Sequence, residues 1–267
     1  MRAAPVGAIL LRQWYLLRGS PVRALPMFAW VGIDVVLWGF IARFLDSVSG
    51  AAINFTAVFL GAVLLWDLCG RVMQGLTTAF LEDVWTRNFL NLFASPLRIS
   101  EYVTGLVLAS IATSLIGLTV MLALAVPVFG LSFLALGAQL LLFLLVLYGF
   151  GVALGILASA MVLRFGPASE WLVWPIPALL SPFCAVFYPL TILPVWMRGV
   201  ARALPPSYVF EGMRAALSGR PFAPLPALWA LLLAALQIAL AAWLFIGVYR
   251  RAVRTGLLAR YSAETLS

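Results

Sequence analysis

The sequence predicts an all-α, polytopic membrane protein that forms one domain over residues 1–267. Of these residues, 64% are hydrophobic and only 10% are charged, whereas about a quarter of the residues in soluble domains are charged. Apolar segments long enough to cross a bilayer recur along the chain, and prolines break the pattern between residues 175 and 217. These observations predict an N-terminal amphipathic interfacial helix, six transmembrane helices, a short cytosolic helix, and a re-entrant extracellular helical pair before the last span.

The residue types that are absent exclude several kinds of chemistry. All 17 basic residues are arginine, and the chain contains neither lysine nor histidine. It therefore lacks the lysine of a phosphate-binding P-loop and the histidine of common metal and acid–base sites. Cys69 and Cys184 lie in separate apolar segments, so we expect core residues and neither a disulfide nor a metal pair. The net charge of +8 and the pI of 10.3 indicate contact with anionic lipids, and no nucleic-acid partner is expected.

The N-terminal segment predicts an interfacial helix and no cleaved signal, because Arg12 interrupts the apolar run before it reaches the length of a signal core. Residues 5–18 fit an amphipathic helix on the cytoplasmic surface. One face of that helix would hold Ile9, Leu10, Gln13, Leu16 and Leu17. Trp14 and Tyr15 favour the membrane interface, and we expect Arg12 and Arg18 to reach lipid headgroups. An ordinary helix flank is the alternative.

Six apolar segments of about 20 residues or more predict membrane-spanning helices. They are residues 24–45, 51–84, 102–128, 133–163, 171–190 and 225–248. Several exceed the length that a bilayer requires, so we expect tilt or projection into the cytosol. The domain then divides into an interfacial helix (1–23), spans one to four with the loop 82–101 (24–164), span five with the external helices (165–224), and span six with a cytosolic tail (225–267).

The distribution of arginine predicts that both ends of the chain are cytosolic. With the N-terminus inside, eleven arginines fall in inner segments: Arg2, Arg12, Arg18, Arg23, Arg87, Arg98, Arg164, Arg250, Arg251, Arg254 and Arg260. Five fall in outer segments: Arg43, Arg198, Arg202, Arg214 and Arg220. The inner excess favours this orientation. Four of the five outer arginines lie in or beside the proline-broken stretch, which makes that stretch unusual in charge as well.

The loop 82–101 is the only substantial charged loop on the predicted inner side. Its large apolar residues share one helical face: Trp85, Phe89, Leu92 and Phe93. Arg87 lies elsewhere on the helix, and Pro96 ends it, because proline disfavours helical geometry at the preceding residue. The pattern predicts a short cytosolic helix whose aromatic side chains dock into a groove on a partner; a helix that rests on lipid is the alternative.

Few ionisable residues lie inside the predicted spans. Asp67 and Arg71 are four residues apart in the second span and can pair with each other, which would be a structural role. Charged groups inside a membrane are also candidates for function. Asp34, in the first span, faces either a cavity or an arginine of another helix.

The proline-broken stretch 175–217 begins as an apolar span and continues as two short amphipathic helices, 195–204 and 207–217. The interrupting prolines are Pro182, Pro189, Pro194, Pro205 and Pro206. Because an interior proline removes a backbone donor and clashes with the preceding turn, one continuous helix is excluded. Such backbone is tolerated at membrane depth only where protein or a water-filled cavity covers it. We expect its arginines to face outer headgroups or a polar exit, and Glu211 to pair with Arg214 or Arg202.

The arrangement resembles the membrane-spanning subunit of ABC exporters of the ABC-2 type, a family that includes bacterial permeases for polysaccharides, teichoic acids and drugs. The order of interfacial helix, six spans and cytosolic ends carries the resemblance over nearly the whole chain. Residues 91–98, followed by Glu101, are similar to the family's coupling-helix region. Residues 187–194, 204–208 and 211–214 are similar to its extracellular helical pair.

The resemblance implies a permease that forms the substrate pathway as a dimer, with a second copy of itself or with a similar subunit. Two separate ABC ATPase subunits would bind ATP and Mg, and this chain would hold no cofactor. The residues implied in ATPase coupling are Trp85, Arg87, Phe89, Leu92, Phe93, Pro96 and Arg98. Those implied in an external gate are Phe187, Tyr188, Pro189, Pro194, Pro205, Tyr208, Glu211 and Arg214. The polar candidates for the pathway are Asp34, Asp67 and Arg71.

The resemblance further implies export of an amphipathic, lipid-linked or polysaccharide substrate, or of a drug, across the bacterial cytoplasmic (inner) membrane. Two other functions stay open at this point. A membrane-embedded enzyme would depend on Asp34 and Asp67 as an acid pair, although no catalytic motif surrounds them. An ion-coupled carrier would need broken helices in both halves of the chain, and only the C-terminal half shows a break. No catalytic or metal-ligating residue is predicted.

Overall fold

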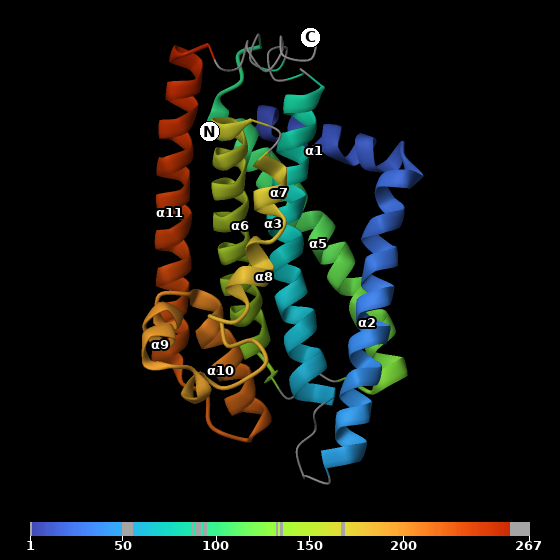
Figure 1. Ribbon diagram of the computed structural model, residues 1–267. Helices are drawn as coiled ribbons and strands as arrows, with labels where there is room; N and C mark the ends of the chain where they lie inside the picture. The colour runs from blue at the N-terminus through green and yellow to red at the C-terminus, as the bar shows by residue number, and fades with distance from the viewer. Residues whose placement is uncertain are drawn as a thin grey trace.

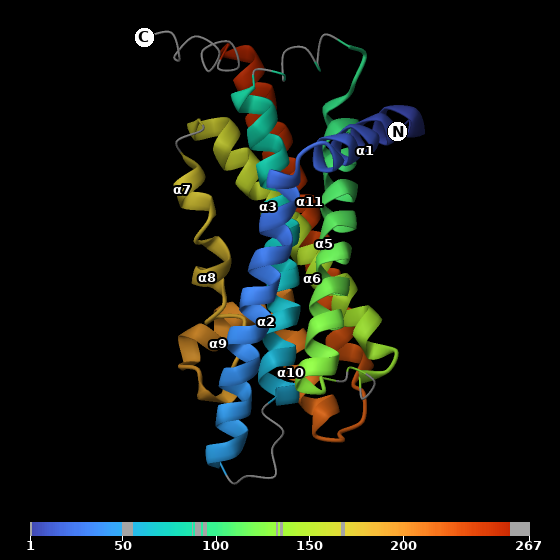
Figure 2. The same ribbon diagram turned by 90° about the vertical axis from the view of Figure 1, so that its right-hand side faces the viewer.

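The computed structural model describes residues 2–49, 56–86, 88, 92, 95–131, 133, 136–166 and 169–256. Every regular element within these residues is a helix, which confirms the all-α class. The long helices lie roughly parallel in one bundle (Figures 1 and 2). They are α2 (Pro21–Ser49), α3 (Gly61–Trp85, continuing from the π-helical turn Thr56–Leu60), α5 (Ile99–Phe129), α6 (Gln139–Phe165) and α11 (Pro224–Arg254).

Four of the described helices are long and apolar enough to cross a membrane: α3 with its preceding turn, α5, α6 and α11. Their bounds differ from the predicted spans mostly at the ends. α6 begins six residues later than predicted, because Gly137 adopts a left-handed turn (φ 51°) immediately before it. At the end of α5, Gly130 takes the left-handed conformation (φ 67°) that commonly terminates helices.

The helix at the centre of the bundle is α3, which packs between α5 and α6. Glycines of α6 allow this close approach. A Cβ atom added at Gly151 would lie 2.8 Å from the carbonyl oxygen of Cys69 and 2.9 Å from Cβ of Val72. One added at Gly155 would lie 2.8 Å from Cδ2 of Leu76. The small residues in the predicted fourth span therefore mark close helix packing, as expected from their spacing.

The N-terminal helix α1 (Ala3–Arg18) lies across one end of the bundle (Figures 1 and 2). Its inward side is the face that the sequence predicts. Ile9 is buried, and Leu10, Gln13, Leu16 and Leu17 are partly buried. Ile9 packs closely on α5, since a Cβ atom added at Gly105 would lie 2.6 Å from the Cβ atom of Ile9. Trp14 and Tyr15 are exposed, as residues at a membrane interface would be.

The prediction of the fifth span as one helix over 171–190 is wrong. The chain instead forms two helices of four and five residues, α7 (Glu170–Val173) and α8 (Ile176–Leu180), followed by an irregular turn and the 3-10 turn Leu190–Ile192. The break comes earlier than predicted, because Pro175 already interrupts the first piece. Figure 2 shows that this segment still runs along the bundle, from the end where α6 finishes to the opposite end.

The predicted helical pair is present as α9 (Val195–Arg202) and α10 (Pro205–Leu217). Both lie at the end of the bundle opposite α1 (Figure 1). Pro194 immediately precedes α9, while Pro205 and Pro206 occupy the first turn of α10. Proline is tolerated in a first turn because the N–H groups there have no partner within the helix. These prolines therefore set where each helix begins.

Candidate functional site

A buried carboxylate at the α1 end of the bundle joins three helices. Asp83, near the end of α3, has no exposed side-chain surface. It forms an ion pair with Arg12 of α1, whose Nη1 lies 2.9 Å from Oδ2, and it accepts a 2.7 Å hydrogen bond from the hydroxyl of Tyr102 on α5. The hydrogen bond with Asp83 raises the pKa of the Arg12 guanidinium. Asp83 thus anchors α1 to α3 and α5.

A second buried carboxylate holds the start of α5. The side chain of Glu101 has no exposed surface and accepts hydrogen bonds from the backbone N–H of Arg98 at 3.1 Å and from Nε of Arg2 at 3.2 Å. Arg2 also donates to the carbonyl of Pro96. Its hydrogen bonds with Glu101 raise the pKa of Arg2. The loop that leads into α5 is therefore tied to the first residues of the chain.

These contacts revise the expectation for Arg12. Sequence analysis places its guanidinium at lipid headgroups, but in the structure it pairs with Asp83. A desolvated carboxylate is stable only with charged or hydrogen-bonding partners, and α1 supplies the nearest cation. The predicted interfacial helix is thus held by specific polar contacts as well as by its apolar face.

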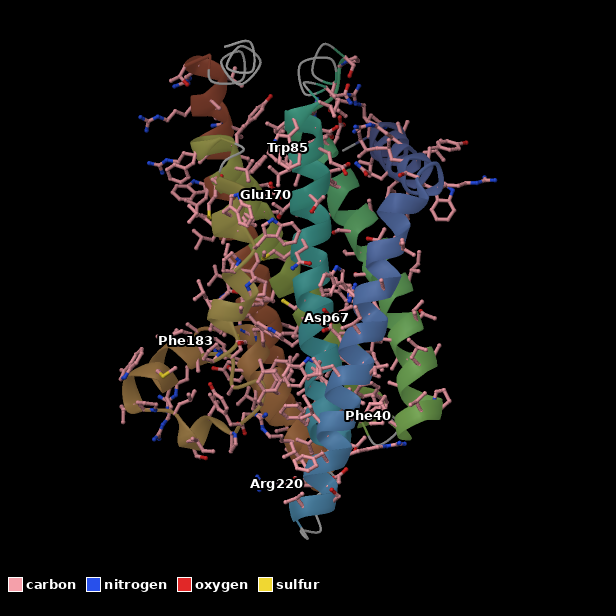
Figure 3. All side chains as sticks on the ribbon, turned by 45° about the vertical axis from the view of Figure 1, so that its right-hand side comes forward. Phe40, Asp67, Trp85, Glu170, Phe183 and Arg220 are labelled. Atoms are coloured by element: carbon pink, nitrogen blue, oxygen red, sulfur yellow. The ribbon has the colours of Figure 1, made fainter. Side chains whose placement is uncertain are left out.

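Four of the residues expected to contact an ATPase are described, and they lie at this same end. Trp85 ends α3 and its side chain is 52% exposed (Figure 3). Leu92 packs against the main apolar cluster, whereas Pro96 and Arg98 are exposed. Three further predicted residues, Arg87, Phe89 and Phe93, lie outside the described residues. The docking helix in this loop therefore stays a prediction.

The intramembrane charges gather around Arg71. Its Nε forms an ion pair with Asp67, one turn earlier on α3, as the spacing predicts. Arg71 also exerts an electrostatic attraction on Asp34 of α2, so Asp34 lies within the field of an arginine of another helix. Both carboxylates thus have a cationic neighbour. That arrangement gives both carboxylates a structural explanation.

A polar stripe runs along one face of α3. The stripe consists of Asp67, Arg71, Gln74, Thr78 and Glu82, each partly exposed on a helix that is otherwise largely buried. Figure 3 shows Asp67 on the face of α3 between α2 and the segment α7–α8. Polar groups on a partly open face in the apolar part of a bundle indicate a wet or partner-covered surface.

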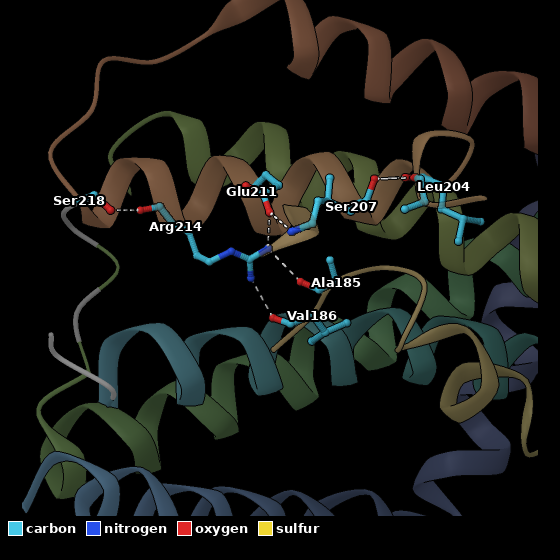
Figure 4. Close-up of polar contacts among 9 residues, drawn as sticks. Ala185, Val186, Leu204, Ser207, Glu211, Arg214 and Ser218 are labelled. Atoms are coloured by element: carbon cyan, nitrogen blue, oxygen red, sulfur yellow. Dashed lines mark hydrogen bonds and ion pairs between the residues drawn. The ribbon is translucent and has the colours of Figure 1, made fainter. Parts of the chain in front are cut away.

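At the opposite end, one ion pair on α10 satisfies the backbone of the broken span (Figure 4). The guanidinium of Arg214 donates hydrogen bonds to the carbonyl oxygens of Ala185, at 2.9 Å, and Val186, at 3.2 Å. Glu211 accepts a 2.8 Å hydrogen bond from the N–H of Leu190 and pairs with Arg214 at 3.1 Å. The turn is buried, and Ala185 adopts a left-handed conformation (φ 51°). Because buried backbone groups need partners, this pair makes the break tolerable.

Aromatic and tyrosine side chains of the predicted gate fix the same turn to its surroundings. The ring of Phe187 stacks on Trp38 of α2 at 6.1 Å and contacts Phe59 at 5.2 Å. Tyr188 donates a hydrogen bond to the carbonyl of Pro182, and Tyr208 to that of Arg202. Pro189 directly precedes the 3-10 turn Leu190–Ile192, as Pro194 directly precedes α9. These residues lie together, and Phe187 connects the turn to α2.

The expected orientation of the outer arginines is wrong for Arg214. Arg214 is mostly buried on carbonyl groups, and Nε of Arg198 lies 2.7 Å from the carbonyl oxygen of Leu193. The predicted pairing of Glu211 with Arg214 is confirmed. Broken backbone offers free carbonyl groups, and arginine carries the donors to satisfy several of them at once. The irregular backbone therefore accounts for two of the four arginines of this stretch, Arg198 and Arg214.

Sequence reasoning missed several residues that organise these two ends. Asp83, Tyr102 and Arg2 received no role. Asp83 and Glu101 are acidic residues at the ends of apolar spans, and the N-terminal segment of the chain carries arginines. This combination is the sequence signal that could have predicted their pairing with Arg12 and Arg2. Both cysteines are free and buried, as expected. Within the described ranges, no cluster of acidic, histidine or cysteine residues is suited to hold a metal ion.

Comparison with known proteins agrees with this architecture. The sequence profile of the ABC-2 type transporter family matches residues 6–218. The matched region runs from α1 to the end of α10 and includes both carboxylate sites, the polar stripe of α3 and the broken span. No curated protein sequence matches the chain.

Proposed function

Since the chain belongs to the ABC-2 type transporter family and is a membrane-spanning permease of an ABC transporter, we propose that it works as an exporter subunit coupled to separate ATPase subunits. The observation that carries this proposal is the clamp at the α1 end, where Asp83 and Glu101 tie α1, the end of α3 and the start of α5 together. A force applied to the loop 82–101 would pass directly into three helices.

The proposed coupling element is that loop, with Trp85 at its start. Two ABC ATPase subunits, carrying ATP and Mg, would dock there, and the permease itself would hold no cofactor and no catalytic residue. The α1 end is then cytosolic, and the chain crosses the bacterial inner membrane six times, with α2 as the first pass and α7–α8 as a broken fifth pass. Both termini lie inside in this topology.

The proposed pathway forms between two copies of the chain. Large apolar side chains of α2 are exposed along one face: Trp30, Ile33, Leu37, Phe40 and Phe44. A second copy, or a similar permease, would cover this face. The polar stripe with Asp67 and Arg71, together with Asp34, would then line part of the route. An amphipathic, lipid-linked or polysaccharide substrate, or a drug, suits a route with both apolar and polar walls.

The proposed external gate is the turn held by Glu211 and Arg214. Its contact between Phe187 and Trp38 of α2 would close the outer end of the route, since α2 faces the second copy. Movement of α2 during the transport cycle would separate these rings. The prolines and the Glu211–Arg214 pair would keep the turn intact while it moves.

The test measures how the permease stimulates ATP hydrolysis by the ATPase that co-purifies with it, after reconstitution. We expect Trp85→Ala, and Phe89→Ala with Phe93→Ala, to reduce the apparent affinity of the two subunits by about 30-fold, as for an interface hot spot of ~2 kcal/mol. The matched control is Trp229→Ala, which removes a similarly exposed tryptophan near the opposite end of the bundle. Normal stimulation by the loop variants would overturn the coupling assignment.

A further inference from the structure

An open cavity lies between the end of α6 and the last turns of α11, away from the proposed route. Its volume is about 670 Å³. Leu163 of α6 and Trp243 and Leu244 of α11 contribute apolar walls. A Cβ added at Gly247, which also lines it, would meet no atom within 4 Å. A side chain at this glycine would therefore project into open space beside the cavity lining.

Three arginines line the same cavity: Arg164, Arg250 and Arg251. No acidic side chain is among the lining residues. The guanidinium of Arg164 lies 5.2 Å from the ring centre of Phe165. Guanidinium groups bind phosphate oxygens through paired hydrogen bonds. The charge of the cavity thus favours an anion, and phosphate is the anion whose geometry fits best.

The position of the cavity points to a lipid as the source of that phosphate. α11 lies at the edge of the bundle (Figure 1), and only 17% of its most apolar window is buried, against 67% for α3. Its apolar surface therefore faces the bilayer. The cavity is at the same end as α1, near the end of both helices, where tryptophan and arginine commonly meet lipid headgroups.

We propose that this cavity binds an anionic phospholipid. The headgroup phosphate contacts Arg250 and Arg251, and an acyl chain lies on the apolar wall beside Trp243. Basic pockets between transmembrane helices at the cytoplasmic side bind anionic lipids in this way. The site holds α11 against α6 on the lipid-facing side and does not depend on which substrate is exported.

The experiment is native mass spectrometry of the full chain in detergent, titrated with phosphatidylglycerol or with phosphatidylcholine. We expect tighter binding of phosphatidylglycerol. Arg250→Gln with Arg251→Gln should weaken it about 25-fold, from roughly a factor of five for each basic residue. The control, Arg202→Gln with Arg220→Gln, removes two exposed arginines at the opposite end and should leave the binding unchanged.

A second variant tests the open space of the cavity independently of its arginines. Gly247→Leu fills the open space with all arginines in place, so it should also weaken phosphatidylglycerol binding. Inorganic phosphate at equal concentration should not displace the lipid. Equal binding of the two lipids, displacement by inorganic phosphate, or full binding by Gly247→Leu would each overturn the proposal.

Discussion

Removing the Arg12 side chain should loosen α1 from the bundle before the bundle itself unfolds. Arg12→Gln leaves Asp83 buried, with the hydroxyl of Tyr102 as a remaining partner. The loss of one partner of a buried ion pair costs about 3–5 kcal/mol. Because the Arg12 side chain is 27% exposed and the hydrogen bonds from Tyr102 and Asn88 remain, we expect a loss of about 3 kcal/mol, at the lower end of that range.

The same carboxylate allows a test of coupling between the partners. Tyr102→Phe removes one hydrogen bond to a charged group, worth about 1.5–3 kcal/mol. Both changes act on Asp83, so the double variant should deviate from additivity by about 0.5–3 kcal/mol. The measurement is the free energy of unfolding in mixed micelles, together with hydrogen exchange of the α1 amides, which should exchange faster in Arg12→Gln.

The matched control for this prediction is Arg18→Gln, which removes an exposed arginine of the same helix. A surface change of this kind usually alters stability by less than about 0.5 kcal/mol. If Arg12→Gln costs no more than Arg18→Gln, and α1 exchanges at the same rate in both, the anchoring role of Asp83 is refuted.

Two further predictions concern helix packing and the broken span. Gly151→Ala should destabilise the protein by about 1–3 kcal/mol, because the added methyl would overlap α3. The control is Gly199→Ala, where a Cβ meets no atom within 4 Å, and it should be neutral or stabilising. Equal free energies of unfolding for the two variants would contradict the packing role of Gly151. Arg214→Lys should cost about 2 kcal/mol and increase proteolysis of the turn at Ala185, because the donors of lysine sit on one nitrogen, whereas Arg214 uses two separate nitrogens for the two carbonyl groups and Glu211. An intact turn in limited proteolysis would count against this prediction.

The sequence predicts the helices of this protein well, because hydrophobic length and proline position act locally. α9 and α10 lie where prolines and amphipathic spacing place them, and the inward face of α1 matches its pattern. The failure at 171–190 has a local cause as well. Pro175 breaks the helix before the later prolines do. The span is predicted from its apolar composition, and composition does not show which residues lack a backbone N–H group for helical hydrogen bonding.

Contacts between distant segments are what the sequence does not reveal. Asp83 and Arg12 are separated by 71 positions, and no local pattern selects this pair over pairing of Arg12 with lipid phosphate. The same holds for Arg214 and the carbonyl of Ala185, 29 positions apart. Glu211 and Arg214 are predictable as a pair because they lie one turn apart, whereas their shared task on the broken backbone requires the fold.

The two ends of the bundle solve one physical problem in different ways, and this affects how variants should be interpreted. At the α1 end, arginine neutralises carboxylates that would otherwise be buried alone; at the other end, Arg214 satisfies carbonyl groups that proline has left without partners. In both cases the charged residue first maintains structure. A transport defect in Arg214 or Asp83 variants therefore identifies a moving part only if unfolding and proteolysis are unchanged. Variants of Trp85 and Phe187 test coupling and gating more directly, because these apolar side chains do not neutralise a buried charge or satisfy a backbone group.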